Sequence, residues 1–476
     1  MKSNSYIPQS QRKKILLIAD DIRAQSGVAR VAREIILNTS HVFNYVCIGG
    51  AIQHQEAGKR LDLSNDTNTL SKIEDSSVIL YPVNGYGDAQ LLRELIKIEK
   101  PDSILLITDP RYFEWVFSIE NEIRKQIPIA YLNIWDSPLP YPDWNKVFYE
   151  SCDLLMAISK QTKNINEVVL GDKKKNKVIT YVPHGLNPEV FKPIDINNNE
   201  FKKFKQYVLP HNPEFVLFFN SRNIRRKQIP DTMLSFRLFL DSLPKEKADK
   251  CTLILHTEVV SEHGTDLEKL RKTLFNKYPK SILFSTSKLT DEDLNKLYNI
   301  ADGQILISSN EGWGLSLTEA ILSGTPIIAS VQGGMQDQMN FIDENGESIE
   351  FSEDFPSNHY GTYKKCGDWV YPIFPNNMSI QGSPKTPYIS DDRCNVKDVV
   401  KQISDLYNTP PQERKQNGLK GREWAINEAG FTSEKMGERV IESFNQLFKG
   451  WNKREKYELI NVTEYKEESI NNPLIY

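Results

Sequence analysis

The sequence has no uninterrupted apolar stretch of the roughly 20 residues that a membrane-spanning helix needs. Its first residues, MKSNSYIPQSQRKK, also lack the apolar segment of a secretory signal peptide. We therefore expect a cytoplasmic protein without a transmembrane segment. The five cysteines are widely spaced and none belongs to a CxxC pair, so the sequence indicates neither a disulfide framework nor a zinc site.

The sequence also lacks a strong charge of one sign, because its formal net charge is only −4. A general affinity for nucleic-acid phosphates is therefore not expected. Two short basic runs, residues 173–177 and 202–205, lie in polar, Asn-rich segments, which favours solvated faces. No Gly-x-Gly-x-x-Gly follows the first predicted strand, and this argues against a nicotinamide-dependent dehydrogenase.

What the sequence does contain is an alternation of short apolar runs and amphipathic stretches, which is typical of βαβ units and a parallel sheet. Residues 14–20 predict a buried first strand, and a Ser-Gly turn then leads into a helix over residues 28–37. A chain of 476 residues exceeds the size that one hydrophobic core usually organises, so two domains are expected. Further strands are predicted at residues 45–48, 77–81, 103–107, 127–134, 154–158 and 178–182, then at 213–220, 251–257, 281–285, 303–308 and 325–330.

These two series predict an α/β protein with two facing Rossmann-like domains and a cleft between them. The first domain is predicted over residues 12–195 and the second over residues 210–430. A segment rich in Pro, Gly and aromatic residues, at about 351–394, interrupts the second domain as an insertion. Residues 431–476 are predicted to form a C-terminal helix and a tail.

The most informative segment is SSNEGWGLSLTEAILSGTPIIAS, residues 308–330. It places Glu311 before a Gly-Trp-Gly turn and Glu319 on the helix that follows. The amides of Gly314 and Leu315 would lie at the N-terminus of this helix, where they can meet an anion. Because carboxylates accept hydrogen bonds from sugar hydroxyls, the segment favours a nucleotide sugar as ligand.

This segment resembles the retaining glycosyltransferases of family four, which have the GT-B architecture of two Rossmann-like domains. The family signature is a Glu, seven residues and a second Glu, which Glu311 and Glu319 match. The resemblance implies that Glu311 contacts the donor sugar near the reaction centre and that Glu319 binds the ribose. Residues 182–193, VPHGLNPEVFKP, are similar to the motif that ends the first domain in this family.

The resemblance extends to the residues that bind the donor diphosphate. In FFNSRNIRRKQ, residues 218–228, Arg222 and Lys227 have the spacing of the family's phosphate-binding arginine and lysine. The neighbouring Arg225 and Arg226 are interpreted as solvated. The turn SGVARVARE, residues 26–34, is similar to the family's Gly-Gly loop, although only Gly27 remains of its glycines. Gly27 is therefore predicted to approach the donor phosphate.

One position departs from the family. The stretch YLNIWDSPLPYPDW, residues 131–144, contains no histidine where family members place one facing the reacting sugar. Asp136 is the nearest polar candidate for a catalytic role. The alternative is that Asp136 caps a turn before Pro138.

A metal site is not expected. The string Asp291-Glu292-Asp293 has the Asp-x-Asp form of metal-binding glycosyltransferases, but Thr290 before it favours the start of a helix. We therefore predict no cofactor and no metal requirement. The predicted partners are a nucleotide sugar and an unidentified acceptor: a glycan, a lipid-linked sugar, a small molecule or a modified DNA base, so that nucleic acid enters only as acceptor. A nucleotide-sugar epimerase and a non-catalytic nucleotide-sugar binding protein remain as alternatives.

Overall fold

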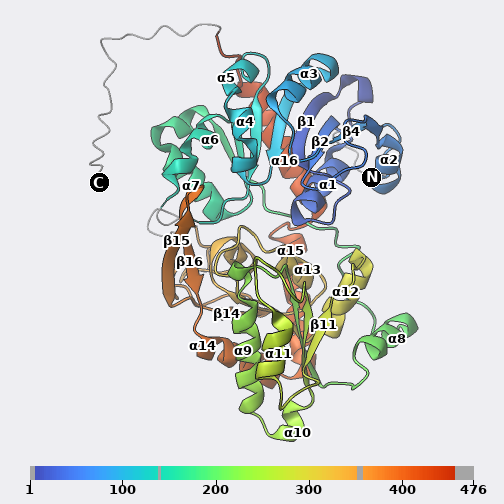
Figure 1. Cartoon of the computed structure of the whole chain (residues 1–476), viewed down its shortest axis with the longest axis vertical. Coiled ribbons are helices and arrows are strands. Elements are labelled where there is room, and N and C mark those ends of the chain that lie inside the picture. The colour runs from blue at the N-terminus through green and yellow to red at the C-terminus, as the bar shows by residue number, and fades with distance from the viewer. Residues whose placement is uncertain (1–5, 138–140, 351–356, 456–476) are drawn as a thin grey trace, which may run out of the picture.

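The computed structural model describes residues 6–137, 141–350 and 357–455 (Figure 1). In these residues the chain forms two large sheets with helices packed around them, one above the other in Figure 1. We call the parts built on these sheets the first half and the second half. Among the described helices, none combines the length and the apolar character that a membrane crossing requires.

The sheet of the first half has eight strands in the order β3-β4-β2-β1-β5-β6-β7-β8. All neighbours are parallel except β3 and β4. Its central strands are buried on both faces, as their continuous apolar sequences predict. The strands are β1 (Lys13–Asp20), β2 (Phe43–Gly50), β3 (Leu61–Asp62), β4 (Val78–Pro82), β5 (Ser103–Ile107), β6 (Ile129–Asn133), β7 (Leu154–Ala157) and β8 (Val178–Tyr181).

Helices connect these strands, and several begin at a side-chain cap. Ser26 caps α1, where its hydroxyl accepts a hydrogen bond from the amide of Ala29. Asp88 caps α3 in the same manner, and Ser159 caps α7. The helices of this half are α1 (Gly27–Thr39), α2 (Ser64–Ser71), α3 (Ala89–Glu99), α4 (Glu114–Phe117), α5 (Glu120–Ile123), α6 (Lys146–Glu150) and α7 (Lys160–Leu170).

The sheet of the second half has six parallel strands in the order β11-β10-β9-β12-β13-β14. The strands are β9 (Phe215–Asn220), β10 (Cys251–His256), β11 (Ile282–Ser285), β12 (Gly303–Leu306), β13 (Ile327–Ser330) and β14 (Val370–Ile373). The helices that follow β8 are α8 (Asn199–Val208), α9 (Ile229–Asp241), α10 (Lys245–Ala248), α11 (Leu267–Leu274), α12 (Asp291–Ile300), α13 (Leu315–Leu322), α14 (Val396–Asn408), α15 (Pro411–Asn427) and α16 (Ser433–Gly450).

The strand order reverses at one place in each sheet. β1 lies between β2 and β5 in the first half, and β9 lies between β10 and β12 in the second half. In open parallel sheets, ligands bind beyond the carboxyl ends of the strands at such a switch point. The topology therefore points to the ends of β1, β5, β9 and β12 as the place for a ligand.

The segment expected as an insertion contributes to the second half in two ways. Its residues 370–373 form β14, which extends the six-stranded sheet beside β13. Its residues 377–393 form a separate antiparallel hairpin of β15 (Asn377–Ser383) and β16 (Thr386–Arg393). The first residues of the segment, 351–356, lie outside the described residues.

The chain crosses between the halves twice. After β8 it enters the second half, and after α15 it returns, so that α16 packs against α1, β7 and β8 of the first half (Figure 1). The two crossings lie side by side, because Leu186 forms a parallel β-bridge with Thr432. The amide of Leu186 donates to the carbonyl of Phe431 at 3.2 Å, and the amide of Ser433 donates to the carbonyl of Leu186 at 2.9 Å.

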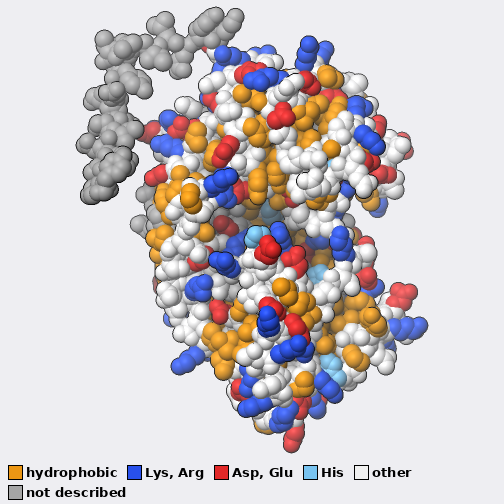
Figure 2. Space-filling model, in the orientation of Figure 1, with side chains coloured by type: hydrophobic (Ala, Val, Ile, Leu, Met, Phe, Trp, Pro, Cys, Tyr) orange, Lys and Arg blue, Asp and Glu red, His pale blue; other side chains and the backbone are white. Residues whose placement is uncertain are grey.

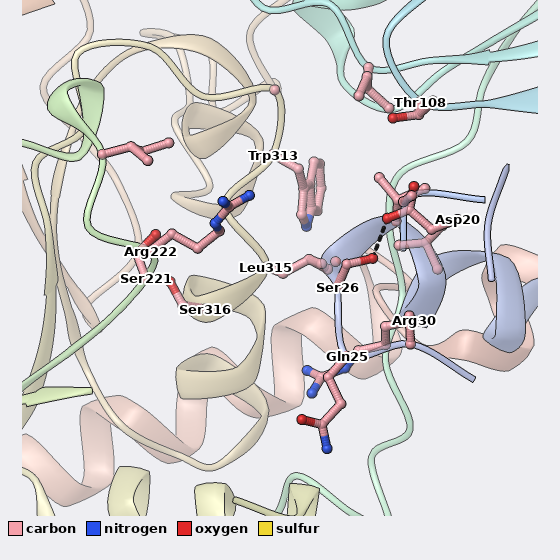
Figure 3. Close-up of a pocket in the computed structure, with 18 of the residues that line it drawn as sticks. Asp20, Gln25, Ser26, Arg30, Thr108, Ser221, Arg222, Trp313, Leu315 and Ser316 are labelled. Atoms are coloured by element: carbon pink, nitrogen blue, oxygen red, sulfur yellow. Dashed lines mark hydrogen bonds between the residues drawn. The ribbon is translucent and has the colours of Figure 1, made fainter. Parts of the chain in front are cut away.

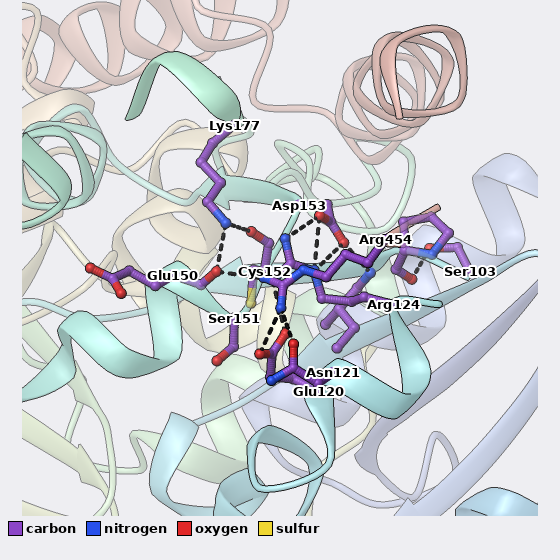
Figure 4. A network of polar contacts seen from close by, with 12 residues as sticks. Ser103, Glu120, Asn121, Arg124, Glu150, Ser151, Cys152, Asp153, Lys177 and Arg454 are labelled. Carbon is purple, nitrogen blue, oxygen red and sulfur yellow. Dashed lines mark hydrogen bonds and ion pairs between the residues drawn. The ribbon is translucent and has the colours of Figure 1, made fainter. Parts of the chain in front are cut away.

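The residues after α16 are fixed on the first half by a buried polar network (Figure 4). The Arg124 guanidinium donates to both carboxylate oxygens of Asp153 and, at 2.9 Å, to Glu120. Arg454 donates to Glu120 at 2.9 Å, and its backbone amide donates to the carbonyl of Arg124 at 3.0 Å. The chain is therefore anchored up to Arg454, and residues 456–476 of the predicted tail lie outside the described residues.

Candidate active site

A cleft of about 1960 Å³ lies between the two halves, at the carboxyl ends of the strands. Figure 2 shows the molecule hollowed between its upper and lower parts on this face. Every residue predicted to bind the donor or to act in catalysis lines this cleft. These are Gly27, Asp136, Arg222, Lys227, Glu311, Gly314, Leu315 and Glu319.

The two loops predicted to meet phosphate face each other across the cleft. Gly314 has a φ of 85°, a conformation that glycine adopts without steric cost, and α13 begins directly after it. No side chain caps this helix, so its first amides remain available to a ligand. On the opposite side, a Cβ added to Gly27 would lie 3.4 Å from Leu315 Cδ1. The start of α1 thus lies close to the Leu315 side chain at the start of α13.

Glu311 is buried where it lines the cleft, and it is paired with two cations from the turn after β9. Lys227 Nζ donates to its Oε2, and Arg226 Nη1 donates to the same atom at 2.9 Å. Burial opposes ionisation of Glu311, but the charges of Arg226 and Lys227 outweigh it and hold its pKa below the usual value. Glu311 is therefore a carboxylate at neutral pH.

Asp136 faces this cluster from the first half. Its Oδ2 lies 3.8 Å from Arg226 Nη1, and 22% of its side chain is exposed. Burial raises the pKa of Asp136 to about 6. The positive charge of Arg226 lowers this pKa, but the negative charge of Glu311 offsets part of that effect. Pro138, which belongs to the alternative interpretation of Asp136 as a turn cap, lies outside the described residues.

Glu319 is buried on α13, where it accepts hydrogen bonds from both halves. The Tyr298 hydroxyl donates to its Oε2 at 2.5 Å and Asn220 Nδ2 donates at 3.0 Å, both within the second half. Arg30, on α1 of the first half, donates to its Oε1 and also to Asp291. Burial raises the pKa of Glu319 although Arg30 opposes this.

Within the described residues Arg222 is exposed and bonds to no acidic side chain, in contrast to Arg226 and Lys227 of the same turn. Figure 3 shows Arg222, Leu315 and Ser26 around the same space, with the Ser26 hydroxyl bonded to Asp20. Lys227, in contrast, is buried against Glu311, and burial lowers its pKa. Of the two predicted phosphate ligands, Arg222 is the one with its charge open to the cleft.

The Asp-x-Asp string forms a helix start, as predicted. Asp291 is the first residue of α12, and the Thr290 hydroxyl accepts a hydrogen bond from the amide of Asp293 at 3.1 Å. Asp291 has a second contact that the sequence did not predict, the ion pair with Arg30. Within the described ranges, no group of three or more His, Cys, Asp or Glu side chains is placed to hold a metal ion.

A histidine does line the cleft, although it comes from a different loop than in the family. His184 is buried, and its ring packs edge-on against Trp313 at a centroid distance of 6.1 Å. Burial lowers the pKa of His184 to about 3, so it is neutral at physiological pH. His184 therefore packs the interface between the halves without adding charge to the site.

The comparisons with known proteins agree with this geometry. Residues 199–352, which carry Arg222, Lys227, Glu311 and Glu319, match the family model of glycosyl transferases group 1. This stretch is a group 1 glycosyl transferase domain. The chain is also 24% identical over 179 residues to Alpha-monoglucosyldiacylglycerol synthase of Acholeplasma laidlawii, an alignment that covers 36% of this chain and 42% of that relative. The chain thus spans less than half the length of this curated relative.

Solved structures extend the likeness over nearly the whole chain. Sucrose-phosphate synthase from Thermosynechococcus elongatus superposes with a TM-score of 0.63 at 16% identity, over 92% of this chain and all of that one. Anabaena Alr3699/HepE in complex with UDP and glucose superposes with a TM-score of 0.61 at 15% identity, over 91% of this chain and all of that one. The predicted GT-B fold around the glycosyl transferase domain is confirmed.

Sequence reasoning missed two arginines of this site. Arg226 was interpreted as solvated, and this was wrong, since it bonds Glu311 and lies between Glu311 and Asp136. Arg225 is exposed, as expected. Arg30 was not considered, because nothing near it in the sequence reveals a partner on α12 or α13. The sequence does place Arg30 one turn into the helix that starts at Gly27, and this position could have indicated that Arg30 lies near the site.

Proposed function

We propose that this chain is a retaining glycosyltransferase, which moves a hexosyl or pentosyl group from a nucleotide sugar to an acceptor. The observation that carries the proposal is the cleft, in which Glu311, Glu319 and the N-terminus of α13 lie around one space with Arg222 open to it. The solved complex of Anabaena Alr3699/HepE with UDP and glucose supports a nucleotide sugar as donor. We further propose that the protein acts in the cytoplasm.

The two glutamates would hold opposite ends of the donor. Glu319 would accept hydrogen bonds from the ribose hydroxyls, with Tyr298 and Asn220 fixing its orientation. Glu311 would accept hydrogen bonds from the hydroxyls of the sugar that is transferred. Its two cations keep it ionised, and an ionised acceptor forms hydrogen bonds roughly twice as strong as a neutral one.

The departing diphosphate would be stabilised by charge and by backbone dipoles. Arg222 supplies a cation, Lys227 a second one behind Glu311, and the amides of Gly314 and Leu315 form a helix N-terminus. The backbone at Gly27 would contribute from the other side of the cleft. Because these groups are already in place, they stabilise the developing charge without reorganisation. We therefore propose that no metal is required.

On the acceptor side, the proximity of Asp136 to Glu311 supports a role at the reaction centre, since one guanidinium nitrogen of Arg226 contacts both carboxylates. We propose that Asp136 lies beside the reacting sugar and orients the acceptor hydroxyl. The hydroxyl would attack from the face that the diphosphate leaves, and its proton would pass to a donor phosphate oxygen. Retention of the anomeric configuration follows from attack on that face.

A thermal-shift screen of nucleotide sugars tests the donor assignment. A ligand at 100 times its dissociation constant stabilises the folded state by about 2.7 kcal/mol, which such a screen detects readily. The best donor is then used in transfer assays with EDTA, with added manganese and with neither. We expect rates within a few-fold of each other and a product of retained configuration. Loss of transfer in EDTA with rescue by manganese would contradict metal independence, and an inverted product would contradict retention.

A further inference from the structure

We propose that the acceptor is a carbohydrate, and that one of its sugar rings stacks on Tyr112 in a subsite walled by the β15–β16 hairpin. This inference rests on the proposed glycosyl transfer and deepens it by naming the class of acceptor. The hairpin lies in the segment that falls outside the family pattern, and it lines the same cleft as Tyr112.

Tyr112 is an aromatic side chain held in place but left open. It belongs to the short 3-10 turn Pro110–Phe113 after β5, and it is 56% exposed where it lines the cleft. Its ring lies 4.9 Å from the ring of Tyr86, whose hydroxyl donates to Asp20 at 2.7 Å. The next residue, Phe113, is fully buried and anchors the turn. An exposed ring on a fixed turn offers contact area at little entropic cost.

Arg111 connects this platform to the reaction centre and to the hairpin. Its guanidinium lies over the ring of Trp135, 5.9 Å from the centroid, and Trp135 immediately precedes Asp136. The same guanidinium donates to Thr386 at the start of β16. Tyr112, Asp136 and the hairpin therefore border one continuous part of the cleft.

The hairpin is a fixed wall because it is bonded to both halves. Its Ser390 amide donates to Ser137 Oγ of the first half at 2.8 Å. Its Asp391 accepts a hydrogen bond from Asn310 Nδ2 of the second half at 2.7 Å. The hairpin residues that line the cleft are mostly polar: Gln381, Gly382, Ser383, Thr386 and Ile389.

This combination fits a sugar better than the other acceptors. A pyranose has apolar C–H faces that cover an aromatic ring and a rim of hydroxyls, which the exposed side chains of Gln381 and Ser383 on the hairpin can meet. A lipid would need a continuous apolar surface instead. DNA would need cations free to neutralise phosphates beside Tyr112, but Arg111, the cation next to it in the chain, is paired with Asp109.

The test uses the full chain and the nucleotide sugar that gives the largest thermal shift. Acceptors are a panel of unphosphorylated mono- and disaccharides, diacylglycerol vesicles, and an oligonucleotide with hydroxymethylated bases. We expect transfer to a member of the sugar panel. Tyr112→Ala should raise the acceptor KM about tenfold and leave the donor dissociation constant unchanged, whereas Tyr112→Phe should restore the KM. Tyr207→Ala, at an 84% exposed tyrosine on α8, is the matched control.

The outcomes separate this inference from the proposed function. Absence of donor binding in the wild type would overturn both. Donor binding with transfer only to vesicles or to the oligonucleotide would overturn the carbohydrate subsite alone. An unchanged acceptor KM in Tyr112→Ala, with transfer to sugars intact, would overturn the role of Tyr112. A lower kcat with an unchanged acceptor KM in Tyr112→Ala would also overturn the role of Tyr112, because an aromatic ring that stacks on the acceptor contributes to acceptor binding.

Discussion

Arg30 and Glu319 form an ion pair across the cleft, although 289 residues separate them in the chain. Arg30 comes from the first helix of the first half, and Glu319 lies on α13 of the second half. The carboxylate that we assign to the donor ribose is thus already bonded to a cation of the opposite half. On this assignment a bound nucleotide would share Glu319 with Arg30 or displace Arg30, which would couple donor binding to the contact between the halves.

The first prediction concerns Glu319. Replacing it with Ala should weaken binding of the free nucleoside diphosphate by about 1.5–3 kcal/mol, the usual value of hydrogen bonds to a charged group. Titration calorimetry measures this, and the thermal midpoint shows whether the variant folds. Glu292→Ala, at an exposed glutamate on α12, is the control and should bind normally. Unchanged affinity in folded Glu319→Ala would remove the ribose assignment.

The second prediction separates two arginines of one turn. Arg222 lines the cleft and Arg225 does not, although both are exposed. Arg222→Ala should therefore reduce affinity for the nucleoside diphosphate by about 1.5–3 kcal/mol and affinity for the nucleoside very little. Arg225→Ala should change neither. Equal losses for the two ligands, or equal losses in the two variants, would contradict a phosphate contact by Arg222.

The third prediction is a pH dependence from Asp136. Because its pKa is raised to about 6, kcat/KM should rise as pH increases through 6 and Asp136 becomes ionised. Arg226 lowers this pKa, so Arg226→Gln should move the rise to higher pH, and Asp136→Asn should abolish it. Rates measured from pH 5 to 8 give the profile. A profile of the same shape in Asp136→Asn would exclude Asp136 as the titrating group.

The raised pKa of Asp136 also makes the free energy of unfolding depend on pH. The carboxyl of Asp136 binds its proton more tightly in the folded chain than in the unfolded chain. The contribution of Asp136 to the free energy of unfolding therefore falls as pH rises from about 4 to about 6. Asp136→Asn should remove this part of the pH dependence of the thermal midpoint.

The fourth prediction concerns the polar network that fixes the residues after α16 on the first half. The Arg124 and Asp153 side chains are only 7% and 10% exposed, so Asp153→Ala would leave a buried charge without its main partner. We expect a loss of about 3–5 kcal/mol of stability, seen as a lower urea midpoint. Asp172→Ala breaks the exposed pair with Lys175 and should cost at most about 1 kcal/mol. Similar losses of stability in both variants would contradict the expectation that a buried ion pair costs more to break than an exposed one.

The sequence predicted most strands of this fold because buried parallel strands are continuous apolar runs. It did not predict β3, which has two residues, or β14, whose sequence VYPI lies in a stretch of mixed composition. Glu311, Glu319 and Arg222 could be located because local motifs determine their place after a strand or at a helix start. Arg30, Arg226 and Tyr112 could not, because their roles depend on which distant side chains the two halves bring opposite them.

The bridge between Leu186 and Thr432 joins the two chain crossings at one place. Because the chain crosses between the halves twice at one place, rotation of the halves about the line through the two crossings is their least restricted relative motion. Twisting or sliding would instead break the backbone hydrogen bonds between the crossings. Gly185 makes this junction tight, since a Cβ there would lie 2.1 Å from the carbonyl oxygen of Thr432. Rotation about this line would part Arg30 from Glu319 and Asp136 from Arg226, and the reverse rotation would bring the same pairs together again.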